Sequence, residues 1–235
     1  MKKTLLFLSA VVLLSGCNKD EANYYPQMKN FAYLYQFEAL PGKVKSTHQT
    51  LFAEDGEQLF EVNADFDKQG CLQHVKSVDK EGKVIEVSRN GDQLTGSENG
   101  QNVVVTLDKH CTMVKKVTPT LTVDISYNPQ GLVEKLSSPN TDVAFNLAYN
   151  SAGEMSVLSI TKAGEEVSRA TAERSSDVKK ISDVVTTVKS NNQTKIVSNT
   201  CKYKNDIPYY CDIVTTDNEG KVLAKQHGNI EVVYY

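Results

Sequence analysis

Two pairs of cysteine and histidine are the clearest candidates for a chemical role in this chain. His74 lies three residues after Cys71, and His110 directly precedes Cys111. Two thiolates and two imidazoles would suit a tetrahedral zinc site. The spacing does not match a known zinc finger, however, and neighbouring His and Cys side chains on a strand do not easily point at one ion. We therefore predict no metal site and favour a disulfide between Cys71 and Cys111.

Two further cysteines, Cys201 and Cys211, flank the segment KYKNDIPYY, which has a turn-like N-D-I-P at its centre. In an oxidising compartment, four cysteines allow three pairings. A Cys201–Cys211 bridge across this hairpin is the economical choice, and by elimination it leaves Cys71 to pair with Cys111. We expect each disulfide to stabilise the fold by roughly 2–4 kcal/mol.

The remaining candidates for catalysis form no recognisable set. His48 and His227 stand apart from any cysteine or acidic cluster, and we expect both at the surface. The sequence contains no G-x-S-x-G nucleophile elbow, no H-E-x-x-H zinc motif and no glycine-rich phosphate loop. Its 29 acids are scattered and often lie in turns, so folding would have to assemble any catalytic pair. We predict a protein that is not an enzyme, with no catalytic residues and no cofactor.

Turns of one type divide the chain. Each begins with Asp or Asn, whose side chain can accept a hydrogen bond from the backbone two residues on, and each ends with glycine, where φ is often positive. The five glycines are Gly70, Gly82, Gly131, Gly153 and Gly220. Between the turns, apolar and polar residues alternate, as in LTVDISY at 121–127. This alternation indicates antiparallel strands with one polar face.

These patterns predict an all-β fold, a meandering antiparallel sheet of ten or more strands joined by hairpins and curled or folded like a sandwich to bury one face. The charged stretch 163–184 is partly compatible with a helix, and we expect a surface helix or loop there. The C-terminal HGNIEVVYY resembles the last strand of an outer-membrane barrel. Short strands with polar faces argue against that architecture.

A Tyr-Asn-x-x-Gly motif occurs twice, with Tyr127 and Tyr149 at its first position. A period of 22 residues corresponds to two strands and two turns, so both tyrosines lie on the same face of the sheet. Over about residues 120–170 the motif resembles the tyrosine–aspartate (YD) repeats of β-rich bacterial surface proteins. We interpret the tyrosines as cross-strand packing residues, with sugar binding as the alternative.

The N-terminal sequence MKKTLLFLSAVVLLSGC has the pattern of a secretory signal. Its last four residues, Leu14–Cys17, resemble the lipobox of bacterial lipoproteins. This resemblance implies a signal peptide at 1–16, cleavage before Cys17 and lipid attachment to Cys17. A polar tether would follow at 17–30, and a single β-rich domain at 31–235. Asn18 after the cysteine resembles the signal for passage to the outer membrane.

Charge and hydropathy narrow the possible partners. Cleavage would remove two lysines and no acids, which changes the formal net charge from −3 to −5. Mild acidity without a Lys/Arg-rich run argues against nucleic acid. No other apolar stretch approaches the length of a membrane-spanning helix. We expect anchoring in a membrane through the lipid on Cys17, on the periplasmic face of the outer membrane in preference to the inner membrane.

Several segments together resemble the YnfC-type lipoproteins, a family of Gram-negative envelopes without an established activity. They are the lipobox at Cys17, Phe37–Leu51, Gly70–Leu72, Cys201–Cys211 and the terminal VYY. The resemblance covers nearly the whole chain, and residues 88–125 match less well. It implies lipid attachment at Cys17 and structural roles for the other four cysteines.

From these observations we expect a non-catalytic envelope module, structural or binding, whose partner is an envelope protein or a glycan. An envelope hydrolase with an unrecognised site is the alternative. A deep pocket that joins His74 or His110 to two acids would favour catalysis. A flat face bearing tyrosines would favour binding.

Overall fold

The computed structural model of this protein describes residues 26–177, 179–191 and 193–235. In these residues a short helix precedes sixteen strands. The elements are α1 (Pro26–Tyr35), β1 (Val44–Ala53), β2 (Gln58–Phe66), β3 (Leu72–Asp79), β4 (Val84–Asn90), β5 (Gln93–Glu98), β6 (Gln101–Leu107), β7 (Met113–Val117), β8 (Thr122–Tyr127), β9 (Val133–Ser137), β10 (Val143–Tyr149), β11 (Met155–Lys162), β12 (Glu165–Arg174), β13 (Val184–Ser190), β14 (Gln193–Lys204), β15 (Ile207–Asp217) and β16 (Val222–Tyr234).

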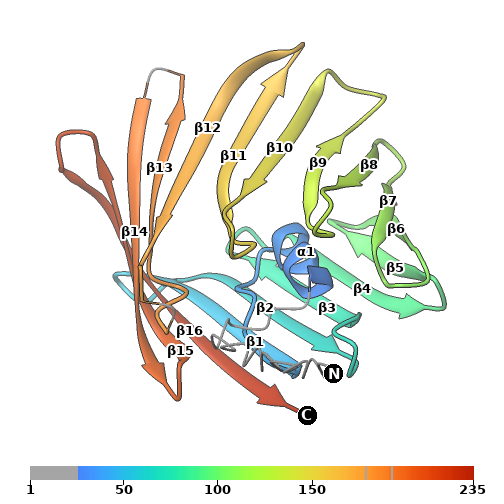
Figure 1. The fold of residues 1–235 in the computed structure, drawn as a ribbon, viewed down its shortest axis with the longest axis horizontal. Coiled ribbons are helices and arrows are strands. Elements are labelled where there is room, and N and C mark those ends of the chain that lie inside the picture. Colours follow the sequence, from blue (N-terminus) through green and yellow to red (C-terminus); the bar gives the residue numbers. More distant parts are fainter. Residues whose placement is uncertain (1–25, 178, 192) are drawn as a thin grey trace, which may run out of the picture.

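Each strand pairs antiparallel with the next along the chain, and β1 also pairs with β16, so the sheet closes into a barrel (Figure 1). The closing register runs from Val44 opposite Tyr234 to Ala53 opposite Gln226. The prediction of an all-β antiparallel meander is confirmed. The predicted shape, a sheet curled or folded like a sandwich, is corrected to a closed barrel. Closure pairs the two edge strands, which would otherwise present unpaired backbone groups.

The alternation along the strands places apolar side chains inside and polar ones outside. On β2, Val62 and Ala64 are buried inside the barrel, whereas Asp65 is exposed on the outer face. On β3, Val75 is buried and Lys76 is exposed. The sequence pattern therefore already contained the distinction between inner and outer faces.

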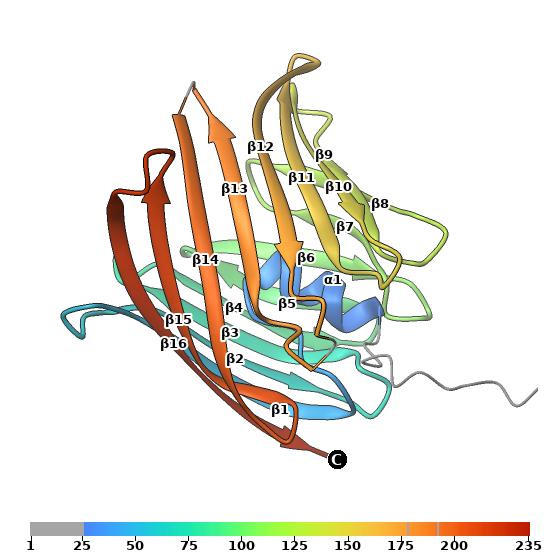
Figure 2. The same ribbon diagram turned by 60° about the vertical axis from the view of Figure 1, so that its left-hand side comes forward.

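The helix α1 lies inside the barrel, between β3–β6 on one side and β10–β12 on the other (Figure 2). Met28 and Phe31 are fully buried in one apolar core with the inward residues of β2–β6. The expected tether at 17–30 is therefore corrected at its end, because residues 26–30 belong to α1. Residues 17–25, like the expected signal peptide at 1–16, lie outside the described residues. Within the described residues, no helix is long and apolar enough to cross a membrane.

Backbone carbonyls of three hairpin turns, those between β6 and β7, β8 and β9, and β10 and β11, accept hydrogen bonds from α1. Asn30 Nδ2 donates to Gly131 O at 2.9 Å, and Asn30 Oδ1 accepts from Val133 N at 2.9 Å. Lys29 Nζ donates to Gly153 O at 2.8 Å, and Gln27 Nε2 reaches His110 O at 3.4 Å. The polar side chains of the helix thus form hydrogen bonds with backbone groups at the ends of the surrounding hairpins.

The five predicted turns have the expected geometry. All five glycines have positive φ, from 71° at Gly153 to 84° at Gly220. The first carboxylate or amide oxygen accepts from the backbone N–H groups two and four residues on, as Asp67 Oδ1 does at 2.9 and 3.0 Å. A sixth turn of this type, at 108–111, was missed because Cys111 occupies the glycine position, with φ 62°.

The expectation of a helix or loop at 163–184 is wrong over its first part, which forms β12. Ser168 to Arg174 pair in continuous register with Ser190 to Val184 of β13. Alanine and glutamate favour helices in isolation, but cross-strand pairing on both sides overrides that preference. The charged composition of this stretch reflects an outer face with Arg169 and Glu173 exposed.

Asn30→Ala should lower the free energy of unfolding by about 2 kcal/mol, because it leaves the buried Val133 N–H without an acceptor and removes the bond to Gly131 O. Urea unfolding followed by circular dichroism measures this change. Gln27→Ala, which removes an exposed contact, is the control and should change stability by no more than about 0.5 kcal/mol. Equal effects of the two variants would show that Asn30 does not hold the helix.

Candidate functional site

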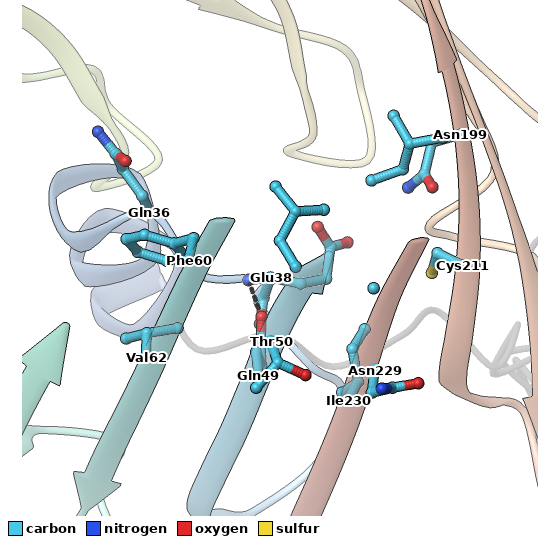
Figure 3. A pocket seen from close by; sticks show the side chains of 13 residues that line it. Gln36, Glu38, Gln49, Thr50, Phe60, Val62, Asn199, Cys211, Asn229 and Ile230 are labelled. Carbon is cyan, nitrogen blue, oxygen red and sulfur yellow. Dashed lines mark hydrogen bonds between the residues drawn. The ribbon is translucent and has the colours of Figure 1, made fainter. Parts of the chain in front are cut away.

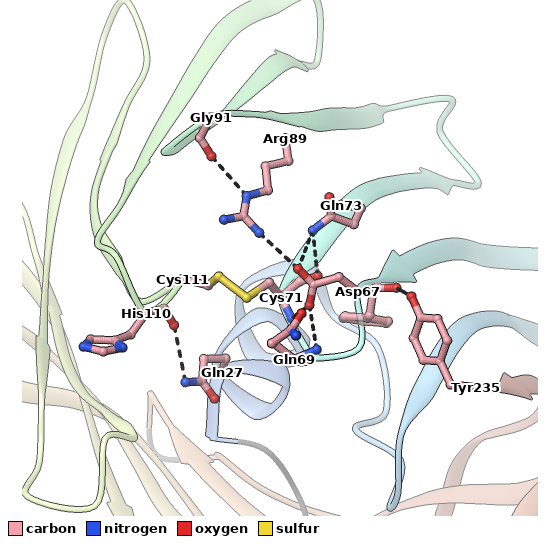
Figure 4. Close-up of polar contacts among 11 residues, drawn as sticks. Gln27, Asp67, Gln69, Cys71, Gln73, Arg89, Gly91, His110, Cys111 and Tyr235 are labelled. Carbon is pink, nitrogen blue, oxygen red and sulfur yellow. Dashed lines mark hydrogen bonds and ion pairs between the residues drawn. A yellow bond between two sulfur atoms is a disulfide. The ribbon is translucent and has the colours of Figure 1, made fainter.

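The structure pairs the four cysteines as the sequence analysis expects. Cys71 and Cys111 are joined with S–S 2.00 Å, and Cys201 and Cys211 with S–S 2.04 Å. Figure 4 shows the first bridge linking the start of β3 to the turn before β7, beside the contact between Gln27 and His110. In the described part of the chain, no group of three or more His, Cys, Asp and Glu side chains is placed to hold a metal ion.

In the described residues, no histidine lines either of the two cavities in the barrel interior at Glu38. His74 is on the outer face of β3, where Nδ1 is 3.6 Å from Asp65 and Nε2 is 3.5 Å from Glu86. His110 is exposed in a turn. His48 Nδ1 lies 2.7 Å from an Asn63 oxygen. The sequence did not show that His74 would meet two acids, but the site is an open strand surface.

His227 stacks between two aromatic rings on neighbouring strands. The ring centroids of Phe52 and Tyr210 lie 5.3 and 5.8 Å from the imidazole. The rings cover one another's faces, so this row offers little free aromatic face for a sugar.

The repeated tyrosines pack inside the barrel. The hydroxyl of Tyr127 donates to Met113 O, and that of Tyr149 donates to Val133 O at 2.7 Å. Burial raises the pKa of both phenols. These contacts agree with the interpretation of cross-strand packing residues, because each hydroxyl is already bonded to the preceding strand, β7 or β9.

Two neighbouring cavities meet at Glu38 in the barrel interior. The first has a volume of about 200 Å³ and lies between the chain after α1 and strands β1, β2, β15 and β16. Figure 3 shows the Glu38 carboxylate pointing into this space, with Phe60 on one side and Asn199 and Cys211 on the other. The second cavity, of about 160 Å³, is lined by α1, Tyr149, Arg174 and Ile181.

The backbone of Glu38 is held by one side chain. Glu38 N donates to Gln49 Oε1 at 2.7 Å, and Gln49 Nε2 donates to Glu38 O at 3.0 Å. Gln49 is itself buried on β1. The amide thus replaces a strand partner for an irregular segment inside the barrel, which satisfies backbone groups that would otherwise be unpaired.

The Glu38 carboxyl is enclosed by protein, and the part of its surface that stays accessible lines the two cavities. Burial raises its pKa, and Glu154 acts in the same direction. Arg174 and a hydrogen bond from Ser182 Oγ at 2.9 Å oppose that rise. The net direction is upward because desolvation is the largest effect.

Arg174 and Lys29 bring positive charge to the second cavity. Arg174 Nη1 donates to Ile181 O at 2.7 Å, and its Nε lies 3.6 Å from Glu154 Oε2. Burial lowers the pKa of Lys29, Glu154 raises it, and Arg174 lowers it further. Two cations and two carboxyl groups therefore converge on one small apolar space.

Sequence reasoning missed this cluster because its members come from distant segments. Lys29 was assigned to the tether, and Arg174 to a surface stretch. Glu38 carried a local signal, since it is an acid between Phe37 and the apolar pair Ala39 and Leu40. Folding must either bury such an acid together with its apolar neighbours or leave those neighbours in water, and both choices cost free energy.

Glu38→Gln should raise the free energy of unfolding at about pH 7 and leave it unchanged below about pH 4. The folded protein holds the Glu38 proton more tightly than the unfolded chain, so the wild type loses stability as pH rises above the ordinary glutamate pKa. Gln is neutral at every pH and avoids this loss. Urea unfolding across this pH range measures the difference, with Glu219→Gln in an exposed turn as the control. A constant difference at every pH would contradict the prediction.

The family model described as "Uncharacterised protein family (UPF0257)" matches residues 1–235. The UPF0257 lipoprotein YnfC of Escherichia coli O81 (strain ED1a) is 26% identical over 234 residues, covering 96% of this chain and 95% of that protein. The protein of that name from Escherichia coli (strain K12 / DH10B) is 25% identical with the same coverage.

Among solved structures, a porin-like protein from Bacteroides uniformis ATCC 8492 aligns with a TM-score of 0.52 and 13% identity, covering 81% of this chain and 96% of that chain. At this identity the alignment shows likeness of fold and nothing about activity. The match over the full sequence does show ancestry: the chain belongs to the UPF0257 family.

Proposed function

We propose that this protein is a lipid-anchored envelope module that binds a small ligand inside its barrel, beside Glu38. The observation that carries the proposal is the pair of cavities that meet at this carboxyl group. Binding sites are typically concave and mostly apolar, with a few polar groups that set the orientation of the ligand. The first cavity fits this description, with Phe60, Ile213 and Ile230 around Glu38.

The anchoring part of the proposal rests on the N-terminal sequence and the relatives. Curated members of the family carry the name lipoprotein. The lipobox pattern ends at Cys17, and Asn18 supports placement on the periplasmic face of the outer membrane. An envelope protein or a glycan remains a proposed partner for the outer surface. The mildly acidic chain gives no basis for binding nucleic acid.

A hydrolase remains the second candidate because Ser182 Oγ lies 2.9 Å from Glu38 Oε1, the arrangement of a nucleophile and a base. Ser182 is 1% exposed, however, and lines neither cavity. A substrate in either space would therefore meet Glu38 and not the hydroxyl, which favours binding over catalysis.

Cys17→Ser should abolish lipid labelling and either release the protein from the membrane or leave it uncleaved, because the thiol is the proposed acceptor of the lipid. Labelling of cells with radioactive palmitate, followed by fractionation, measures both effects. The double variant Cys201→Ser/Cys211→Ser is the control and should label like the wild type. Continued labelling of Cys17→Ser would refute the anchor.

The intact lipoprotein in nanodiscs should bind at least one of four molecules of equal ring size: toluene, benzyl alcohol, benzylamine and benzoate. Equilibrium dialysis against labelled compounds, corrected with empty nanodiscs, measures saturable binding. Ala39→Leu should weaken binding because it adds volume to a residue that lines the second cavity. Ala148→Leu, on an exposed position of β10, is the matched control. Absence of saturable binding for all four compounds would refute the interior site.

A further inference from the structure

We propose that the ligand of the first cavity is a small uncharged alcohol, whose hydroxyl group bonds to Glu38 and whose apolar body fills the rest of the space. This inference rests on the proposed function and specifies the class of ligand. It is drawn from three features of the described residues: the apolar wall of the cavity, the single ionisable side chain in its lining and one carboxyl oxygen to which no protein group donates.

The wall of the first cavity favours an apolar ligand of limited size. Its volume is about 200 Å³. An apolar protein cavity of about 150 Å³ accommodates benzene, so by proportion this one has room for about eight non-hydrogen atoms. Gln36 also lines the cavity and is exposed, which opens the space to solvent. The apolar part of the wall comes from β1, β2, β15 and β16 and includes Leu51, Phe60, Val62, Ile213 and Ile230.

Glu38 has bonding capacity that the protein leaves unused. The amides of Gln49 and Asn199, in the same lining, already bond to Glu38, Thr47 and Ser182. Glu38 Oε1 accepts from Ser182 Oγ at 2.9 Å, whereas within the described residues Oε2 has no hydrogen-bond partner. Three buried side-chain polar atoms of these residues lack a partner, and Oε2 is not one of them, so it keeps accessible surface. Because the carboxylate points into the cavity (Figure 3), a ligand can reach it.

The charges around the cavity favour an uncharged ligand. Among the described residues that line it, Glu38 is the only one whose side chain can ionise, since Cys211 is in a disulfide. A ligand carboxylate would therefore meet a second carboxyl group and no cation in this wall. A ligand ammonium would be a third cation beside Lys29 and Arg174, which line the second cavity with the acids Glu38 and Glu154. An ionic group without a balancing charge is costly in an apolar space.

A hydroxyl group suits Glu38 in either protonation state. It donates to an oxygen of the ionised carboxylate, and it accepts from the O–H of the protonated carboxyl group. Binding therefore does not depend on the charge of Glu38. It depends on a polar group at this position, and the amide of a glutamine would also offer both a donor and an acceptor.

The test compares toluene, benzyl alcohol, benzylamine and benzoate on the intact lipoprotein in nanodiscs at about pH 7, by equilibrium dialysis with empty nanodiscs as the blank. Benzyl alcohol should bind at least about tenfold more tightly than benzylamine or benzoate, which are both charged at this pH. Glu38→Gln should change the affinity for benzyl alcohol by no more than about twofold. Glu38→Leu should raise the affinity for toluene relative to benzyl alcohol by about tenfold, because it removes the bonding partner of the hydroxyl group.

Gly228→Ala tests whether the ligand occupies the first cavity. Gly228 lies opposite Leu51 and Cys211 on the neighbouring strands, and all three line this cavity. An added Cβ would have Thr50 O, at 3.4 Å, as its nearest neighbour, so the methyl group fits and takes volume from the cavity. Benzyl alcohol should then bind about threefold more weakly. Ala148→Leu, at an exposed position of β10, is the control and should have no effect.

Each outcome decides the inference. Equal or tighter binding of benzylamine or benzoate would overturn the alcohol class and leave the interior binding site standing. No binding of any of the four molecules would overturn both. Loss of benzyl alcohol binding in Glu38→Gln would show that the ligand needs the charge of Glu38, which contradicts an uncharged alcohol. If Glu38→Leu does not fold, Gly228→Ala gives a further measurement, and unchanged binding in that variant would place the ligand outside the first cavity.

Discussion

The docking of α1 inside the barrel is the contact on which the rest of the structure depends. A sheet of sixteen strands encloses more space than its own inward side chains can fill, as wide barrels generally do. Met28 and Phe31 fill part of that space with apolar volume. Asn30 and Lys29 then bond to carbonyls of hairpin turns that would otherwise face the helix without a partner. Barrel closure and helix position therefore support each other.

The helix fills the barrel unevenly. The candidate site lies between the side that the helix packs against and the side that stays more accessible. Several inward residues of β2–β6, such as Val75 and Val105, are completely buried in the same core as α1. Some residues of β10–β15 keep part of their surface accessible, for example Phe145 at 36%. Glu38 lies where the chain leaves the helix for the wall, after a residue with φ 59° at Gln36. The irregular backbone there needs side-chain partners, and Gln49 provides them.

One disulfide lies near the start of α1, and the other lies near the candidate site. Cys71–Cys111 joins two hairpins near the start of α1, across 40 residues of sequence. Cys201 lies close to the site, since its backbone N–H donates to Asp183 Oδ1 at 2.8 Å, next to Ser182. Each bridge holds two segments of the wall together and restricts the unfolded chain, which stabilises the fold.

The sequence by itself determined the local structure. Asx turns, positive-φ glycines and alternating strands follow from interactions between residues a few positions apart, and the cysteine pairing followed from one short hairpin. Closure depends instead on contacts such as Thr47 Oγ1 with Glu231 O, 184 residues apart, and the same alternation would suit an open sheet equally well. The cluster of Lys29, Glu38 and Arg174 comes from three distant segments, and no local pattern shows that they meet. Only the tertiary structure brings them together, because the helix and the wall must both be in place before their side chains share one cavity.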